Sequence, residues 1–493
     1  MKRCAIILGL LFFIPVSGHA ADDPVQKALK AYEKHQYGTA ARDLRAALPS
    51  LPQGRQSSAR LALGMIYLKS AELHRAFAGM SLAVNTDYLK RLSRETGKDR
   101  SRYADLFLGI ANLEAGKPNE ASPQLEKFLA GSESPKEKAV AQIALGTAAR
   151  LRGDGQRAQE LWGAVDAAEP DSRTEIAAAY GRAGAADRDP VLLCDGALAE
   201  IKKTGKQPSA AAVKNCIGVY GRAGAFDKGF DLLQRGDLGA YAYRESLGKS
   251  KALSFYDVRL LSNLASLYLR ASLASLEKAA ADPELNGAAN YYLGEAHLLA
   301  GDRDQAARAT AAFLASPQQP PQFRSKALVR QAEIRHEIGR QADARGVWDE
   351  LARSQPGDPE LLGEILSACG RLRIDCPRVV QTSLLALERG EGRTYMALHA
   401  GLGRYYLGKK EYPKALVHLE AGRDKGNKNK IEANDPLLLV DIADAAYRTK
   451  KFSEALEIYF EMSKQFPQVR QIQEAVQGIY AMEQKSAGDV KIN

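Results

Sequence analysis

One stretch of the chain, residues 291–306, reads YYLGEAHLLAGDRDQA and decides the fold class. Its first half is rich in leucine and alanine and lacks proline, which is typical of a helix. Gly301 and Asp302 then break the pattern, and Ala306 follows Gly294 by twelve residues. A small residue midway along each of two successive helices lets antiparallel helices approach closely. The stretch therefore predicts a helical hairpin.

The same twelve-residue spacing recurs along most of the chain. Glycine comes first in the pairs Gly64 and Ala76, Gly109 and Ala121, Gly146 and Ala158, Gly294 and Ala306, and Gly403 and Ala415. Alanine takes both places in the pairs Ala28 and Ala40, Ala332 and Ala344, and Ala443 and Ala455. One hairpin cannot bury its apolar face alone, so successive hairpins are expected to stack.

These residues resemble the tetratricopeptide repeat (TPR) family. Its unit of 34 residues has Leu-Gly and an aromatic residue on the first helix, Ala and a bulky residue on the second, and Pro at the end. Several prolines match the end position: Pro52, Pro170, Pro356 and Pro467. The resemblance covers residues 24–170 and 286–470. It implies an all-α fold, an α-solenoid of stacked antiparallel helix hairpins in a TPR-like superhelix, and a role in binding proteins.

Between these two parts the pattern weakens. The motif YGRAGA at residues 180–185 recurs at 220–225 and suggests a degenerate hairpin, whereas no Gly-Ala pair follows from about Phe226 to Asn286. There we expect an irregular central joint, with a loop and then a long helix from about Ser254 to Ala281. The expected domains are solenoids at 21–225 and 286–485, joined by 226–285, with a disordered tail at 486–493.

The N-terminus has the pattern of an export signal. Lys2 and Arg3 precede an apolar run that ends at Val16, and small residues lead to Ala20. The run of about 13 residues is shorter than the ~20 that a helix needs to cross a bilayer. We therefore expect residues 1–20 to be a cleaved signal peptide, with an uncleaved anchor as the alternative. The mature chain is expected to be periplasmic or otherwise exported, with a peripheral position at the outer membrane as one option.

Four cysteines remain after the signal peptide, and they permit three pairings. Cys194 and Cys216 flank a polar turn between two expected helices, and Cys369 and Cys376 flank a shorter one. Antiparallel helices would bring the members of each pair together, so we predict these two disulfides. Four unlinked buried thiols are the alternative. A zinc site is not expected, because neither pair has tight ligand spacing and no histidine lies near.

Composition and motifs argue against an enzyme. Lys and Arg number 69 against 59 Asp and Glu, a net charge of +10, and the basic segments are interrupted loops. Nucleic acid is therefore not an expected partner. The pair Glu245-Ser246 is similar to one in exported lytic transglycosylases, but the Gly-Leu-Met-Gln segment of that family is missing. We expect no catalytic residue, no cofactor and no metal.

Residues that lie one turn either side of the small residue of each first helix are expected to line the concave groove. The apolar candidates are Leu61, Met65, Leu68, Tyr103, Leu106, Ile110 and Leu113. The largely polar candidates are Arg150, Tyr291, Glu333, His336, Arg404, Tyr447 and Arg448. The apolar stripe either receives a partner or packs against the chain itself. The polar part either binds a peptide or helix or is a solvated face.

The expected function is that of an exported, non-catalytic TPR scaffold, which binds protein partners in the cell envelope through its concave groove. The alternative is a polysaccharide- or peptidoglycan-associated envelope factor, either a secretion adaptor or a degenerate hydrolase. An envelope polysaccharide or an anionic membrane surface is therefore a second class of partner.

Overall fold

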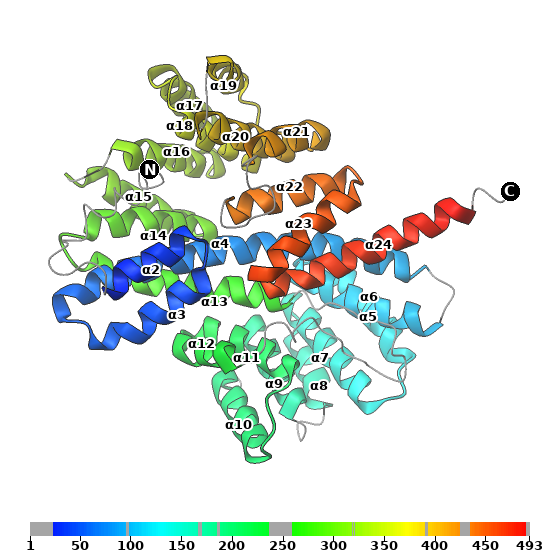
Figure 1. The fold of residues 1–493 in the computed structure, drawn as a ribbon. Coiled ribbons are helices and arrows are strands. Elements are labelled where there is room, and N and C mark those ends of the chain that lie inside the picture. The colour runs from blue at the N-terminus through cyan, green and yellow to red at the C-terminus, as the bar shows by residue number, and fades with distance from the viewer. Residues whose placement is uncertain are drawn as a thin grey trace. The chain divides into compact units, whose positions relative to one another are not determined.

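The computed structural model describes residues 23–94, 98–165, 170–184, 188–235, 259–317, 319, 321–389, 393–423 and 434–489. Within these ranges the helix is the one regular element, which confirms the all-α fold (Figure 1). The predicted signal peptide lies outside the described residues, and so do Glu245 and much of the predicted joint.

The chain divides into two compact units. Unit 1 comprises Met1–Glu72 and Ala271–Glu461, and unit 2 comprises Leu73–Arg270 and Met462–Asn493. This division differs from the two sequential arms that we expected. The reason lies in unit 1, where Leu276 fills the space over Gly64 and the Ser272 hydroxyl donates a 2.7 Å hydrogen bond to the Gly64 carbonyl. These contacts join a residue near the start of the long helix at 53–92 to the helix at 259–280, which lies about 200 residues further along the chain.

Unit 1 holds the two helices nearest the N-terminus and most of those after residue 285. They are α2 (Pro24–Glu33), α3 (Tyr37–Ala47), α14 (Asn286–Ala300), α15 (Arg303–Ala315), α16 (Pro321–Glu337), α17 (Gln341–Ser354), α18 (Pro359–Leu372), α19 (Pro377–Arg389), α20 (Arg393–Gly408), α21 (Tyr412–Gly422) and α22 (Pro436–Arg448), with a short 3-10 helix at Leu48–Ser50. The unit boundaries fall inside α4 (Gln53–Leu92), α13 (Arg259–Ala280) and α23 (Phe452–Gln465).

Unit 2 holds the helices of the middle of the chain and the last one. They are α5 (Lys98–Glu114), α6 (Pro118–Ala130), α7 (Pro135–Leu151), α8 (Gly155–Gly163), α9 (Pro170–Ala183), α10 (Pro190–Lys203), α11 (Ala210–Ala223), α12 (Phe226–Arg235) and α24 (Arg470–Asp489), with a 3-10 helix at Pro467–Val469. Helix α24 includes residues 486–489, which the sequence analysis assigned to a disordered tail.

The hairpin of α14 and α15 shows why the sequence folds this way. Helix α14 ends at Gly301, whose φ of +81° lies in the left-handed region that glycine adopts without strain. The Asp302 side chain then caps α15 by accepting a 3.1 Å hydrogen bond from the Gln305 amide. A Cβ atom on Gly294 would lie 2.7 Å from the Thr310 hydroxyl oxygen. The glycine therefore permits the close approach of the two helices.

Most of the predicted pairs form hairpins of this kind. They join α2 to α3, α5 to α6, α7 to α8, α14 to α15, α16 to α17 and α20 to α21. The first helices also contact one another in series, from α5 through α7 and α9 to α11 in unit 2, and from α14 through α16, α18 and α20 to α22 in unit 1. Each unit thus has a layer of first helices, which we call its first-helix face.

One predicted hairpin was wrong. Gly64 and Ala76 do not lie on two antiparallel helices, because α4 is a single helix of 40 residues that contains both. The intervening segment carries no glycine or proline that would end the helix. Gly64 still accommodates a close neighbour, but this neighbour is Leu276 of α13.

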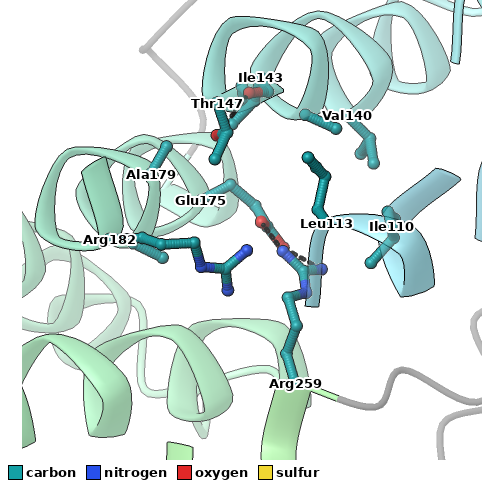
Figure 2. A pocket seen from close by; sticks show the side chains of 11 residues that line it. Ile110, Leu113, Val140, Ile143, Thr147, Glu175, Ala179, Arg182 and Arg259 are labelled. Carbon is teal, nitrogen blue, oxygen red and sulfur yellow. Dashed lines mark hydrogen bonds and ion pairs between the residues drawn. The ribbon is translucent and has the colours of Figure 1, made fainter. Parts of the chain in front are cut away.

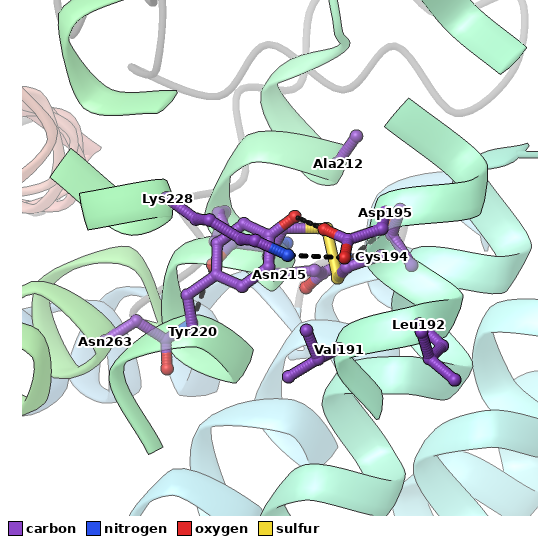
Figure 3. The surroundings of a disulfide bond; sticks show 12 residues. Val191, Leu192, Cys194, Asp195, Ala212, Asn215, Tyr220, Lys228 and Asn263 are labelled. Carbon is purple, nitrogen blue, oxygen red and sulfur yellow. Dashed lines mark hydrogen bonds and ion pairs between the residues drawn. A yellow bond between two sulfur atoms is a disulfide. The ribbon is translucent and has the colours of Figure 1, made fainter. Parts of the chain in front are cut away.

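Both predicted disulfides are present. Cys194 and Cys216 join α10 to α11 with their Cα atoms 5.7 Å apart, and Cys369 and Cys376 are 6.4 Å apart at the turn that follows α18. Figure 3 shows the first bond with Tyr220, whose hydroxyl donates a 2.7 Å hydrogen bond to Asp195. The disulfide and this hydrogen bond connect the same two helices.

Candidate functional site

The apolar residues of the predicted groove are buried. Leu61, Met65 and Leu68 on α4 are no more than 5% exposed, and the same holds for Tyr103, Leu106, Ile110 and Leu113 on α5. The α5 residues belong to a hydrophobic cluster with residues of α6, α7 and α8. This is the arrangement expected of a stripe that packs against its own chain.

Ile110 and Leu113 nevertheless line a pocket on the first-helix face of unit 2 (Figure 2). The pocket is small: the space that a water molecule can occupy in it is about 20 Å³, which is roughly enough for one water. The remaining lining residues come from α7, α9 and α13: Val140, Ile143, Ala144, Thr147, Glu175, Ala178, Ala179, Arg182 and Arg259. The pocket thus combines an apolar wall with a group of charged side chains.

A buried ion pair occupies the centre of this charged group. Arg259 donates hydrogen bonds of 2.8 and 3.3 Å to the two carboxylate oxygens of Glu175, and the Lys214 ammonium lies 3.6 Å from the same carboxylate. Burial alone would raise the pKa of Glu175, but Arg259 and Lys214 outweigh it and lower the pKa to about 2. Glu175 is therefore ionised at neutral pH.

A second group of charges adjoins the pocket at Arg182. Its guanidinium lies 2.8 Å from a carboxylate oxygen of Glu114, at the end of α5. Arg222 of α11 lies close enough to Arg182 and to Arg270 of α13 for its charge to interact with theirs. Burial, followed by the positive charge of Arg182, lowers the pKa of Arg222 to about 10, while Glu114 acts in the opposite direction.

The first-helix face of unit 1 carries a different arrangement, in which opposite charges alternate. Arg330 of α16 forms ion pairs with Glu295 of α14 at 2.7 Å and with Glu364 of α18 at 2.9 Å. Arg371 continues the series with two hydrogen bonds of 2.8 and 2.9 Å to Glu333. Burial alone would raise the pKa of Glu364, but Arg330 and neighbouring cations lower it to about 2.

The predicted polar residues take several positions. Glu333 and Tyr447 are buried, Tyr291, His336 and Arg404 are partly buried, and Arg150 and Arg448 are exposed. Arg404 forms a 2.7 Å hydrogen bond with Asp441 of α22. Burial and the charge of Glu295 hold the pKa of Tyr291 well above its usual range. Of this set, Glu333 and Arg404 belong to inter-helix ion pairs on the face.

No site was predicted from the sequence at Arg330, Glu364, Glu175, Arg182 or Arg222. The first two left a signal, because Glu295, Arg330 and Glu364 follow one another at intervals of 35 and 34 residues. That interval is the length of one TPR unit, so opposite charges at this spacing predict contacts between neighbouring repeats. Glu175 and Arg259 are separated by 84 residues and by a stretch without repeats, and no such signal connects them.

Two further features bear on the kinds of site that the fold could hold. In the parts of the chain that the structure describes, no group of three or more His, Cys, Asp and Glu side chains is placed to share a metal ion. None of the described helices combines the length and the apolar character that crossing a membrane requires.

Comparison with known proteins finds similar structures but no similar family or curated sequence. No protein-family model matches the chain, and no curated protein matches it. Among solved structures, it is similar to a chain of the APC/C hetero-tetramer Cut9–Hcn1, with 14% identity and a TM-score of 0.27 over 96% of this chain and 99% of that one. It is also similar to yeast Tom70, with 13% identity and a TM-score of 0.32 over 95% of this chain and 98% of that one.

The class of the protein follows from its own architecture. Antiparallel hairpins with small seam residues, first helices in series and ion pairs at intervals near 34 residues define a TPR-like α-solenoid.

Proposed function

We propose that this protein is an exported, non-catalytic scaffold that binds protein partners on its first-helix faces. The observation that carries the proposal is the pocket of unit 2, where an apolar wall and ionised side chains lie side by side. An apolar anchor with a few placed charges is the arrangement by which proteins recognise segments of other proteins.

The polar face of unit 1 supports the same function. Tyr291 and Arg404 retain partial exposure beside the buried ion pairs, and Arg448 is exposed at the end of α22. Tyrosine offers rigid contact area and arginine offers paired hydrogen bonds, which are the groups favoured at protein interfaces.

Export is proposed from the N-terminal sequence and from the cysteines. The signal-like residues 1–20 would direct the chain out of the cytoplasm, and two disulfides persist in an oxidising compartment. We place the protein in the cell envelope, with the periplasm as its compartment. Sequencing of the mature N-terminus tests this: a chain that begins at Ala21 supports export, and one that keeps Met1 contradicts it.

Site-specific photocrosslinking tests the binding function. A photoreactive amino acid replaces Arg150, which is exposed on first helix α7, or Arg157, which is exposed on second helix α8. The second position is the matched control, because it lies on the same hairpin. We expect envelope proteins to crosslink at position 150 and not at 157 after irradiation of intact cells. Equal crosslinking at both positions, or none at either, would contradict the proposal.

The alternative of a polysaccharide- or peptidoglycan-associated factor gives a different outcome. Retention of the protein on purified sacculi or acidic glycans, without protein crosslinks at position 150, would support that alternative. Both experiments leave the fold intact, because Arg150 and Arg157 are exposed.

A further inference from the structure

The last three hairpins of unit 1 share an unusual residue in the turn between their two helices. In other hairpins this turn has a glycine in the left-handed region: Gly116, Gly153, Gly184, Gly224, Gly301 and Gly339. In the turns that follow α18, α20 and α22, the same conformation is adopted by Arg373, Lys410 and Lys450, with φ between +56° and +62°. In the rest of the described chain, His35 is the one other non-glycine residue with a positive φ.

The helix dipole does not explain why basic residues take this position. A residue with a side chain is strained there, whereas glycine is not. Helices α7 and α11 have a basic residue in their last turn, Arg150 and Arg222, and are still followed by a left-handed glycine. Helices α18 and α22 also have such a residue, Arg371 and Arg448, before the one in the strained position. Strain that is kept at three consecutive turns indicates a function for their side chains.

The three turns lie next to one another in unit 1. The Lys409 ammonium, in the turn after α20, is 2.6 Å from the Asp375 carboxylate in the turn after α18. The Arg448 guanidinium, at the end of α22, is 5.9 Å from the centre of the Tyr412 ring at the start of α21. We call residues 373–375, 409–411 and 449–451 together the basic edge.

The basic edge carries excess positive charge. It has five basic residues and two acidic ones, a net charge of +3: Arg373, Lys409, Lys410, Lys450 and Lys451 against Asp375 and Glu411. Asp375 is ion-paired with Lys409, and Glu411 with Lys414 at 2.5 Å. Arg373, Lys410 and Lys450 are exposed, so the excess charge faces the solvent.

The second helices that begin at the first two turns add exposed apolar side chains. Leu385 of α19 is 48% exposed, and Val417 of α21 is 68% exposed. Val417 follows the exposed Lys414 by three residues and Leu385 follows the exposed Arg378 by seven, which places each pair on one side of its helix. Cations and apolar groups therefore share the exposed faces of α19 and α21.

We propose that the basic edge and these faces of α19 and α21 bind an anionic lipid bilayer. The lysine and arginine side chains attract the charged headgroups, and the leucine and valine side chains enter the boundary between headgroups and acyl chains. A soluble acidic polymer would pair with the cations but would leave the apolar side chains in water. The proposal goes beyond the scaffold function and does not depend on it, because the surface uses turns and second helices and not the first-helix faces.

Flotation of the mature full-length protein with lipid vesicles tests the proposal. The vesicles consist of equal parts of phosphatidylcholine and phosphatidylglycerol, and vesicles of phosphatidylcholine alone are the reference. We expect the protein to float with the anionic vesicles only. A basic residue close to an anionic bilayer contributes about fivefold to binding, so the triple variant Arg373→Gly, Lys410→Gly, Lys450→Gly should bind about 100-fold more weakly. Equal binding to both kinds of vesicle, or an undiminished affinity of the triple variant, would overturn the proposal.

A charge-matched variant and a stability measurement separate this role from others. Replacing Lys202, Lys203 and Lys206 by glutamine removes three exposed charges from unit 2 and should leave lipid binding unchanged. A loss as large as that of the glycine variant would mean that net charge alone attracts the protein, against the proposal. The glycine variant should unfold at the wild-type temperature or above, because glycine relieves the strain at all three turns. A lower unfolding temperature with unchanged lipid binding would show that the basic residues are structural.

Two further measurements distinguish a bilayer from a soluble polyanion. Leu385→Ser with Val417→Ser alters two exposed positions and should weaken binding to the anionic vesicles by about tenfold without a change in unfolding temperature. Soluble polygalacturonate at the same concentration of negative charge should displace little of the bound protein. Complete displacement by polygalacturonate, together with unchanged binding of the serine variant, would assign the surface to an acidic polymer and reject the bilayer.

Discussion

The seam between α18 and α20 predicts that one change, glycine to alanine, has opposite effects at two positions of unit 1. Gly401 of α20 faces Gly363 of α18 so closely that an added Cβ atom would lie 2.5 Å from the Gly363 Cα and 2.8 Å from its carbonyl oxygen. Gly346 of α17 is exposed, and nothing lies within 4 Å of the corresponding Cβ position. Both residues are in helix interiors.

The magnitudes follow from two terms. Replacing glycine by alanine in a helix stabilises the folded state by about 1 kcal/mol, and at Gly346 this is the whole effect. At Gly401 the new methyl group must move from 2.5 Å to the 3.5–4.0 Å of an ordinary carbon contact, so the helices must separate by about 1 Å. Overpacking of this kind costs about 1–3 kcal/mol. Because backbone atoms cannot rotate away, we expect about 3 kcal/mol, or about 2 kcal/mol net.

Thermal unfolding followed by circular dichroism measures both effects. Gly401→Ala should lower Tm by about 4–8 °C, and Gly346→Ala should raise it by about 2–4 °C. The double variant should show the sum of the two shifts, since the substitutions lie on different helices without a shared partner. A Gly401→Ala protein that is as stable as Gly346→Ala would refute the close backbone packing of α18 and α20.

Three further predictions concern the disulfides and the titratable groups. Replacing Cys194 and Cys216 by serine should lower the free energy of unfolding by roughly 3.4 kcal/mol, and replacing Cys369 and Cys376 by roughly 2.5 kcal/mol, as urea denaturation of each double variant would measure. The folded-state pKa of Glu175 is lowered to about 2, so its contribution to stability is complete above about pH 5 and is lost as the pH falls toward 2. In Glu175→Gln the urea midpoint of unfolding should therefore depend less on pH below about pH 5. A midpoint that falls with acid as steeply as in the wild type would count against the ion pair. Burial lowers the pKa of His418, whose Nδ1 lies 2.8 Å from the Nδ1 of His399 and can share one proton with it. The contribution of neutral His418 to the free energy of unfolding is complete above about pH 6.5 and is lost as the pH falls below that value. The free energy of unfolding of His418→Gln should therefore change less between about pH 7.5 and about pH 5.5 than that of the wild type.

The hairpins were predictable because their determinants are local. A small residue on each helix and a Gly-Asp turn between them are visible in residues 291–306, and the structure shows the corresponding cap at Asp302 and the close approach at Gly294. The two disulfides were predictable for the same reason, since each closes a short loop. No glycine or proline lies between Gly64 and Ala76, and there the twelve-residue spacing wrongly predicted a hairpin, because spacing alone does not end a helix.

The candidate site was harder to predict because its residues come from distant parts of the chain. Glu175 and Arg259 are 84 residues apart, and the repeat pattern ends between them at about Phe226. Arg222 is distinguished by the absence of an acceptor for its Nε and Nη2 atoms in its described surroundings. Both properties depend on the tertiary structure and cannot be predicted from neighbouring residues in the sequence. The apolar stripe on α5 illustrates the converse, since periodicity identified Leu106 as facing other helices but could not tell a partner from the chain's own residues.

The alternating charges on the first-helix face of unit 1 also limit how this chain can evolve. Arg330 contacts a glutamate on the first helix of the preceding hairpin, α14, and another on α18, the next first helix. If the segment that carries Glu295 were duplicated in tandem, two copies of that acid would become neighbours and one would lose its arginine. Growth by copying single hairpins would then be selected against in this region. Lengthening would require a compensating basic residue in the inserted copy, so the order of the hairpins here is specified and not interchangeable.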